Sequence, residues 1–183
     1  MKRILLWFGV CAVVCGCGGP KPRPKSSIGT LLSRFSGFKT FEVLSPDFKD
    51  RGLLPAASQG PTGKAPELQW PGAPKEAKAF AICVENADIQ STRPFLFWMV
   101  ANVPAGDKFQ EGGIPGKNDA GTEGYSGPAP KPGEDYRYHF EVFALDRKLT
   151  LLPGFSRDEL ERAMKGHVLA QGELIARSTP LED

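Results

Sequence analysis

The stretch Gly116–Tyr138, GKNDAGTEGYSGPAPKPGEDYRY, decides how the rest of the sequence is interpreted. It is rich in Gly, which adopts backbone angles that other residues avoid, and in Pro, which fixes its own φ angle. This composition is typical of a surface loop, but Tyr125, Tyr136 and Tyr138 give the loop side chains that can pack. Loops held in one shape by a rigid scaffold commonly carry binding sites. The stretch therefore predicts a structured binding loop that leads directly into a strand.

On both sides of this loop the hydrophobic pattern is that of β-strands. Apolar or aromatic residues alternate with polar ones along 136–145, where one face would carry Tyr136, Tyr138, Phe140, Val142 and Ala144. Alternation bounded by Gly and Pro is the signal of a half-buried strand, and a continuous apolar run indicates a fully buried one. By the same criteria we expect strands at Phe41–Leu44, Glu67–Trp70, Ala79–Glu85, Phe95–Val103 and Val168–Ala176.

One helix is marked between the last two of these strands. Ser156 can cap its first turn, and Glu159, three residues later, completes a capping box. Gly166 is placed to end it. Strands separated by long loops, with a helix near the end, predict a mostly β fold: a β-sandwich with one or two short helices late in the chain.

The N-terminal residues have the pattern of an export signal. Lys2 and Arg3 precede a short apolar run, and small residues follow, which is the order of a secretory signal peptide. The segment Val14–Cys17 is similar to a bacterial lipobox, so Cys17 is the expected lipidation site; an ordinary signal peptide or an uncleaved anchor is the alternative. We therefore expect a signal peptide at 1–16, a basic, Pro-rich tether at 17–39, and one domain at 40–183. The protein would be lipid-anchored in a bacterial cell envelope.

Charge and cysteine content limit the classes of function. Seven of the 23 basic residues lie before residue 40, whereas all 21 acidic residues lie after it, which gives the remainder a formal net charge of −5. A nucleic-acid partner is not expected, because such binding needs a clustered basic face. Once the signal peptide is removed and Cys17 is modified, Cys83 is the one remaining thiol, within an apolar run typical of a buried core.

Seven short segments, in order, are similar to one known family. They include Pro66–Trp70 (PELQW), Phe97–Pro104 (FWMVANVP), Gly116–Asp119 (GKND), Gly124–Pro128 (GYSGP) and Tyr136–Tyr138 (YRY). The chain resembles the phosphatidylethanolamine-binding protein (PEBP) family, in its bacterial branch of Raf-kinase-inhibitor-like proteins, from about Phe41 to Ile175. The resemblance implies a β-sandwich with a shallow pocket that binds phosphate-like anions through His side chains and backbone N–H groups.

The resemblance also implies which positions form the pocket. They are Glu85, Asp88, Phe97, Trp98, Gly124, Tyr125, Gly127, Pro128, Pro130, Lys131, Tyr136 and Arg137. At the positions of the two family histidines this chain has Phe97 and Tyr136, so the usual donors to an anion are absent. Lys131 and the Tyr136 hydroxyl are the groups that could compensate. Arg137 could reach the pocket, or it could pair with Glu134 or Asp135.

Two functions from different classes follow from these observations. The first is an envelope ligand-binding domain with a degenerate anion pocket, which binds a small ligand that is partly apolar or carries phosphate. The second is a protein-interaction or inhibitor module with an envelope protein as its partner and no small-molecule ligand. No catalytic residues, metal site or cofactor are expected: Glu85 and Asp88 have no nucleophile beside them, and His139 and His167 are too far apart in the sequence to suggest a zinc site.

Overall fold

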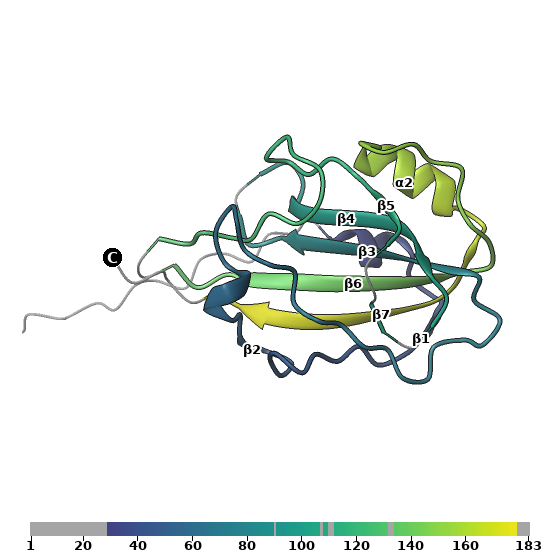
Figure 1. Ribbon diagram of the computed structural model, residues 1–183, viewed down its shortest axis with the longest axis horizontal. Coiled ribbons are helices and arrows are strands. Elements are labelled where there is room, and N and C mark those ends of the chain that lie inside the picture. Colours follow the sequence, from purple (N-terminus) through teal and green to yellow (C-terminus); the bar gives the residue numbers. More distant parts are fainter. Residues whose placement is uncertain (1–28, 90, 107, 110–111, 132–133, 179–183) are drawn as a thin grey trace, which may run out of the picture.

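The computed structural model describes residues 29–89, 91–106, 108–109, 112–131 and 134–178 (Figure 1). The predicted signal peptide and Cys17 lie outside these residues. None of the helices in the described part is long and apolar enough to cross a membrane.

One mostly antiparallel sheet organises the domain. Its long central strands are β7 (Val168–Arg177), β6 (Arg137–Leu145), β3 (Ala79–Asn86) and β4 (Phe95–Pro104), in that order across the sheet. Three two-residue strands complete it: β1 (Lys39–Thr40) and β2 (Gly52–Leu53) pair with β7 in parallel, and β5 (Ile114–Pro115) pairs with β4. All four long strands coincide with predicted ones, whereas the three two-residue strands were not predicted.

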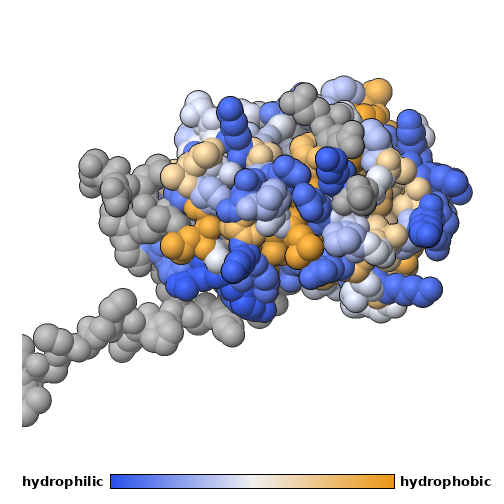
Figure 2. Space-filling model, turned by 60° about the horizontal axis from the view of Figure 1, so that its bottom comes forward, coloured by the Kyte–Doolittle hydropathy of each residue, from blue (hydrophilic) through white to orange (hydrophobic). Residues whose placement is uncertain are grey.

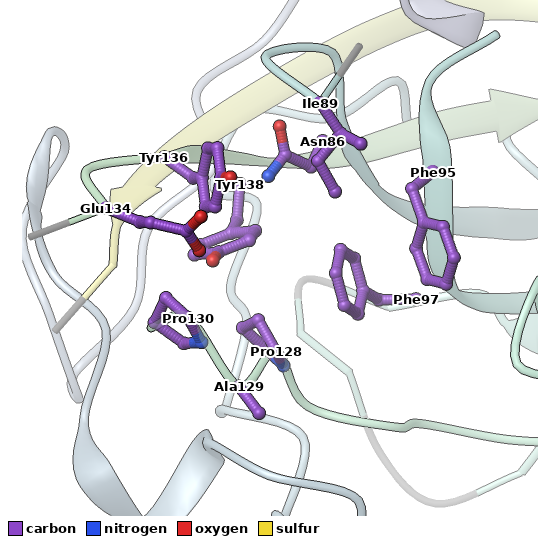
Figure 3. A pocket seen from close by; sticks show the side chains of 10 residues that line it. All are labelled: Asn86, Ile89, Phe95, Phe97, Pro128, Ala129, Pro130, Glu134, Tyr136 and Tyr138. Atoms are coloured by element: carbon purple, nitrogen blue, oxygen red, sulfur yellow. The ribbon is translucent and has the colours of Figure 1, made fainter. Parts of the chain in front are cut away.

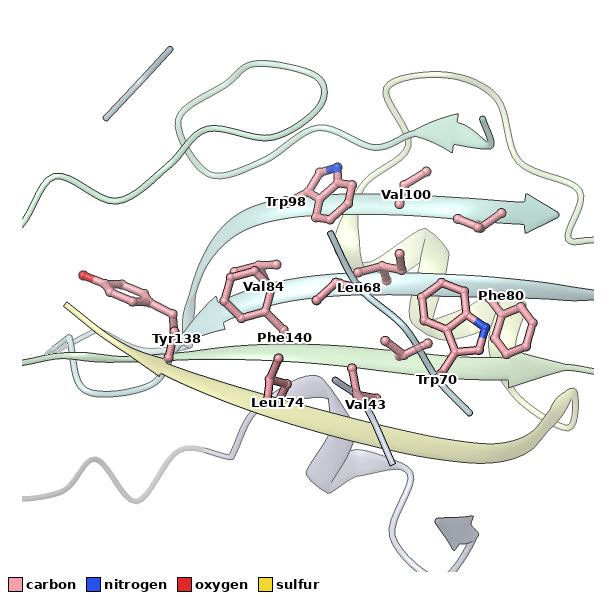
Figure 4. Packing of buried hydrophobic residues seen from close by; sticks show 14 of the residues in the cluster. Val43, Leu68, Trp70, Phe80, Val84, Trp98, Val100, Tyr138, Phe140 and Leu174 are labelled. Carbon is pink, nitrogen blue, oxygen red and sulfur yellow. The ribbon is translucent and has the colours of Figure 1, made fainter. Parts of the chain in front are cut away.

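The sheet is covered on both faces, which explains why every residue of β3 is buried. On one face, loop segments between residues 41 and 70 lay Val43, Leu68 and Trp70 on the aromatic side chains of β3 and β6 (Figure 4). Segments 41–44 and 67–70 are therefore a second layer, but they join through the single bridge Leu44–Gln69 rather than through the full strands expected. The mostly β fold is confirmed, with one extended layer and one irregular layer.

Two helices cover the opposite face. The helix α2 (Arg157–Met164) begins with the predicted capping box, in which Ser156 and Glu159 exchange side-chain and backbone hydrogen bonds. Gly166 follows its end with a positive φ of 78°, a conformation that glycine adopts without strain. Together α1 (Leu31–Arg34) and α2 bury Leu31, Leu160 and Met164 against Cys83 and its neighbours.

The folded part of the chain extends further toward the N-terminus than predicted. Helix α1 falls within the range 17–39 assigned to the tether, yet Leu31 is fully buried and Phe35 packs edge-to-face on Phe143 of β6 at 5.6 Å. The backbone N–H groups of Leu31 and Leu32 donate to the buried carboxylates of Glu85 and Glu141. Residues from about 30 onward thus belong to the domain.

Two irregularities in the pairing of β3 and β4 shape the sheet. Val84 pairs with Trp98 and Glu85 with Leu96, so Phe97 is an extra residue that faces no residue of β3. Such a bulge re-aims the side chains around it, and here it brings both Phe97 and Trp98 to the same core cluster while Leu96 joins the other. The second irregularity, near the other end of β4, holds Asn102 at a φ of 57°, where its side-chain amide exchanges two hydrogen bonds with the backbone of Leu149.

The exposed surface carries few large hydrophobic side chains. Of the described residues, Phe38, Leu44, Leu53 and Leu152 are the large apolar residues classed as exposed. On the face drawn in Figure 2, hydrophobic residues reach the surface in patches among hydrophilic ones.

Candidate functional site

A cavity of about 250 Å³ lies where β3 ends, β4 begins and the Gly/Pro-rich loop leads into β6 (Figure 3). Ten described residues line it: Asn86, Ile89, Phe95, Phe97, Pro128, Ala129, Pro130, Glu134, Tyr136 and Tyr138. Its volume is slightly below the ~300–1,000 Å³ of pockets for drug-sized ligands. The site is therefore suited to a small molecule.

Aromatic rings form much of the wall. The Phe97 ring stands perpendicular to the Tyr138 ring, with centroids 5.5 Å apart, and lies 4.9 Å from the Phe95 ring at a tilt of 54°. Phe97 reaches this position because the β-bulge turns it out of the regular alternation of β4. Tyr138 points to the same side because it shares its sheet face with Phe140 and Val142.

The opposite wall is the Gly/Pro-rich loop, which close backbone contacts hold in place. A Cβ atom on Gly127 would lie 2.3 Å from the carbonyl oxygen of Ser58, so only glycine fits there. The Pro128 carbonyl accepts a hydrogen bond from Gly60 N at 2.9 Å, and the Tyr125 hydroxyl donates to the Ser58 carbonyl at 2.8 Å. Tyr125 also packs edge-to-face on Trp98 at 5.7 Å, behind the cavity wall. This predicted binding loop is thus a structured wall, anchored to the turn at residues 56–60.

Asn118 fixes the beginning of the same loop. Its side-chain nitrogen donates to the Thr122 hydroxyl and to the carbonyl oxygens of Phe97 and Gly124, at 2.9 to 3.3 Å. Asn118 is almost fully buried, so these hydrogen bonds are shielded from water. The residue connects the loop directly to the bulge that carries Phe97.

Asn86 supplies a polar group that the sequence-based interpretation missed. Its side chain is fully buried, and its Oδ1 accepts a hydrogen bond from Asp88 N at 2.7 Å. Its Nδ2 has no hydrogen-bond partner among the described residues, and Figure 3 shows this nitrogen directed into the cavity. Leaving a buried donor unpaired costs about 1–3 kcal/mol. The amide is therefore available to an acceptor on a bound ligand.

Asp88 and Arg137 pair with each other instead of lining the cavity. The Asp88 carboxylate accepts hydrogen bonds from Arg137 N and Nε, both at 2.9 Å, and from Nη2. Burial alone would raise the pKa of Asp88, but the hydrogen bonds and charge of Arg137 outweigh it and lower that pKa. Arg137 therefore forms its ion pair with Asp88, and its sequence neighbour Asp135 pairs with Arg177.

Glu85 lies on the other face of the sheet. Alternation along β3 sends Asn86 toward the cavity and Glu85 toward the helices, where Glu85 forms an ion pair with Arg157 and accepts a hydrogen bond from Leu31 N at 2.8 Å. Both charged side chains are buried. The prediction that Glu85 lines the pocket is wrong for this reason.

A second buried carboxylate, Glu141, lies on that same face. Its Oε2 accepts a hydrogen bond from Leu32 N at 3.0 Å, and burial is the main cause that raises its pKa to about 8. Burial also raises the pKa of the Cys83 thiol, with the Glu141 charge as a further cause. A high thiol pKa and a buried position do not favour a reactive cysteine.

Of the twelve positions proposed by resemblance, four line the cavity: Phe97, Pro128, Pro130 and Tyr136. Trp98, Gly124, Tyr125 and Gly127 support it from behind or within the loop, and Lys131 is exposed, with its backbone N–H donating to Glu134 Oε2 at 3.1 Å. The lining residues outside that set are Asn86, Ile89, Phe95, Ala129, Glu134 and Tyr138. The alternation of side chains along β3 and β6 could have identified Asn86 and Tyr138 as lining residues, because each lies on the same sheet face as predicted core residues.

The two histidines lie outside the cavity. His139 Nδ1 lies 2.8 Å from Glu173 Oε1, and His167 Nδ1 lies 3.1 Å from Asp146 Oδ1 near the end of α2. Among the described residues, no three or more His, Cys, Asp or Glu side chains are grouped so that they could hold a metal ion.

Comparison with known proteins gives one consistent result. The model of the family named phosphatidylethanolamine-binding protein matches residues 44–179. A UPF0098 protein of Methanothermobacter thermautotrophicus is 36% identical over 140 residues, covering 70% of this chain and 91% of the relative. A UPF0098 protein of Aquifex aeolicus is 32% identical over 166 residues, covering 81% of this chain and 96% of the relative.

Solved structures agree with these sequence relatives. A Chlamydia trachomatis protein described as a phosphatidylethanolamine-binding protein homologue has a TM-score of 0.70 and 28% identity, over 79% of this chain and 99% of that one. Escherichia coli YbcL has the same fold, with a TM-score of 0.69 at 24% identity, over 78% of this chain and 99% of its own.

Proposed function

The chain belongs to the phosphatidylethanolamine-binding protein family, and from that premise we propose that it is a non-enzymatic binding protein whose cavity holds a small, partly apolar ligand. The observation that supports this proposal is the cavity of about 250 Å³, in whose wall the amide nitrogen of Asn86 has no hydrogen-bond partner among the described residues. Aromatic and proline side chains offer apolar contact, and one buried donor can orient a ligand. Concave, mostly apolar sites with a few placed polar groups are the usual form of ligand pockets.

The anion-binding chemistry implied by the family resemblance is degenerate in this proposal. Phe97 and Tyr136 stand where the resemblance implies histidines, and both line the cavity. The described lining residues include one carboxylate, Glu134, and no Lys, Arg or His. Lys131 is exposed outside the cavity, and Arg137 is paired with Asp88. The described lining therefore offers a phosphate no cationic side chain, which argues against phosphate as the preferred group.

We further propose that the domain works in a bacterial cell envelope, tethered through lipid on Cys17. The support is the sequence: a basic start, a short apolar run and a lipobox-like Val14–Cys17. The basic, Pro-rich segment after Cys17 would serve as a spacer, and its charge would favour anionic headgroups. Replacing Cys17 with Ser and following membrane fractionation tests this part, because the variant should leave the membrane fraction.

Thermal unfolding with a panel of small amphiphilic molecules tests the binding function. A ligand at 100 times its Kd stabilises the native state by about 2.7 kcal/mol, which is easily measured. Ala129→Trp is the blocking variant, since Ala129 is an exposed residue that lines the cavity. Ala105→Trp is the matched control at an exposed position beyond the far end of β4.

The proposal predicts stabilisation of the native protein and of Ala105→Trp, and none of Ala129→Trp. Equal stabilisation of both variants would place any binding outside the cavity. No stabilisation by the whole panel, together with capture of a defined envelope protein, would favour the alternative of a protein-interaction or inhibitor module.

A further inference from the structure

We propose that the cavity selects a neutral ligand in which a carbonyl-type oxygen is attached to a flat apolar group. This inference rests on the proposed binding function and specifies the chemical class of the ligand. Two features of the cavity support it: the amide of Asn86, which is held in place as a hydrogen-bond donor, and the rings that line the space in front of it.

The orientation of the Asn86 amide follows from its hydrogen bond with a neighbour. The side chain is fully buried at the end of β3. The backbone N–H of Asp88, which can only donate, lies 2.7 Å from one of the two amide atoms, so that atom is the oxygen Oδ1. The other atom is therefore the nitrogen Nδ2, which has no hydrogen-bond partner among the described residues and points into the cavity (Figure 3).

The residue that orients this amide is itself held firmly. The Asp88 carboxylate accepts hydrogen bonds from Arg137 N and Nε, both at 2.9 Å, and from Nη2. These bonds join the segment that follows β3 to the first residue of β6. Asp88 and Arg137 are thus positioning residues, since they hold the N–H group that fixes the Asn86 amide. A donor that is already oriented needs little ordering when a ligand binds.

The oriented donor selects the polar group of the ligand. A hydrocarbon would leave Asn86 Nδ2 buried without an acceptor, which is unfavourable. The carbonyl oxygen of a ketone, amide or ester accepts this hydrogen bond and adds no charge to the site. An anion also accepts a hydrogen bond, but the described lining residues include no Lys, Arg or His to balance its charge. A neutral carbonyl group therefore fits best.

The lining rings select the shape of the apolar part. The Phe97 ring stands at 89° to Tyr138 and at 54° to Phe95, so a flat ring can pack edge-to-face between them. Pro128 and Pro130 line the cavity from the loop (Figure 3). Benzene fills a protein cavity of about 150 Å³. The cavity of about 250 Å³ therefore accommodates one ring with a short carbonyl substituent, and acetophenone is a suitable probe.

The test compares acetophenone with α-methylstyrene, which has almost the same shape but carries C=CH₂ in place of C=O. NMR titration gives the dissociation constants of both for the native protein and for Asn86→Leu, which keeps the branched shape of the side chain and removes the donor. The hydrocarbon leaves water more readily, so the informative quantity is how the ratio of the two constants changes between the proteins. We expect acetophenone to lose about tenfold relative to α-methylstyrene in Asn86→Leu.

Asp88→Asn tests the positioning role, because it removes the charge that Arg137 binds and keeps the backbone N–H that bonds to Asn86. We expect the preference for acetophenone over α-methylstyrene to fall about threefold, with the affinity for the hydrocarbon unchanged. Asp135→Asn is the matched control, since Asp135 is exposed and accepts two hydrogen bonds from Arg177 outside the cavity lining. It should retain the native preference.

The outcomes separate this inference from the binding function itself. An equal ratio in the native protein and Asn86→Leu, with both ligands lost in Ala129→Trp, would overturn the carbonyl preference and leave the small-ligand site intact. Tighter binding of benzoate than of acetophenone would overturn the preference for a neutral ligand. If Asn86→Leu does not fold, an equal ratio in Asp88→Asn and Asp135→Asn overturns the inference instead. If neither probe nor any amphiphile of the thermal panel binds, the proposed function fails together with it.

Discussion

Glu141→Gln should abolish most of the loss of stability that the native protein undergoes as pH rises from 4.5 to 8. Glu141 is fully buried on β6, beneath α1, and its Oε2 accepts a hydrogen bond from Leu32 N. Burial is the largest cause that raises its pKa from 4.5 to about 8, and the nearby charge of Glu173 raises it further. Near neutral pH the native protein therefore holds a proton on Glu141 that the unfolded chain has released.

The size of the effect follows from the two pKa values. A tenfold change in proton affinity is worth about 1.4 kcal/mol, so a rise from 4.5 to about 8 corresponds to about 5 kcal/mol. Below pH 4.5 both states are protonated and the contribution to stability is fully present. Between pH 4.5 and 8 the native state binds more protons than the unfolded state, so stability falls as pH rises. Above pH 8 both states are ionised and the loss is complete.

Glutamine resembles the protonated glutamate and keeps an oxygen for Leu32 N, but it cannot ionise. We expect Glu141→Gln to be within about 1 kcal/mol of the native protein at pH 5 and more stable by up to about 5 kcal/mol at pH 9. Urea unfolding followed by tryptophan fluorescence measures both values, since Trp70 and Trp98 are buried. Glu42→Gln is the matched control, because Glu42 is exposed, and it should retain the native pH dependence.

The reasoning would be refuted if Glu141→Gln and the native protein had parallel stability curves from pH 5 to 9. A variant that is less stable at pH 9 than the native protein would also refute it, since that would show that the ionised carboxylate is favoured by the hydrogen bond it accepts from α1.

Three further predictions concern the buried ion pair, the loop and the altered pocket. Arg157→Met should leave the buried carboxylate of Glu85 unpaired and destabilise the protein by about 3–5 kcal/mol in urea unfolding; a loss below 1 kcal/mol would show that the pair is dispensable. Gly127→Ala should cost about 1–3 kcal/mol and abolish ligand-induced thermal stabilisation, because its Cβ would lie 2.3 Å from a backbone carbonyl oxygen. The double variant Phe97→His, Tyr136→His should gain phosphate binding at millimolar concentration by calorimetry, since it restores two donors to an oxyanion; no gain would mean that the remaining loop and wall no longer form an anion site.

The sequence predicted the long strands and α2 well, because their signals are local. Ala79–Val84 is a continuous apolar run, and Ser156 with Glu159 forms a capping box that specifies its own helix start. The short strands were not predictable in this way, since β1 and β2 consist of two residues each and exist only through pairing with β7. Their position depends on tertiary contacts that no local pattern records.

The site was predicted less completely, because residues were selected by motif and not by sheet face. Glu85 matched a family carboxylate, but the alternation of β3 turns it away from the cavity and turns Asn86 toward it. The bulge at Phe97 depends on the register between β3 and β4, and the pairing of Arg137 with Asp88 joins residues 49 positions apart. Neither could be derived from one strand considered alone.

The most direct measurement of the central claim is a titration of the ¹⁵N-labelled protein with a small amphiphile that stabilises it in the thermal panel, followed through the side-chain amide resonances of Asn86. Those resonances are assigned by their absence in Asn86→Asp. If a small ligand fills the cavity, the Asn86 amide protons shift on binding with the dissociation constant measured by calorimetry, and they do not shift in Ala129→Trp. Unshifted Asn86 resonances at a saturating concentration of that amphiphile, or identical shifts in the blocked variant, would contradict the account.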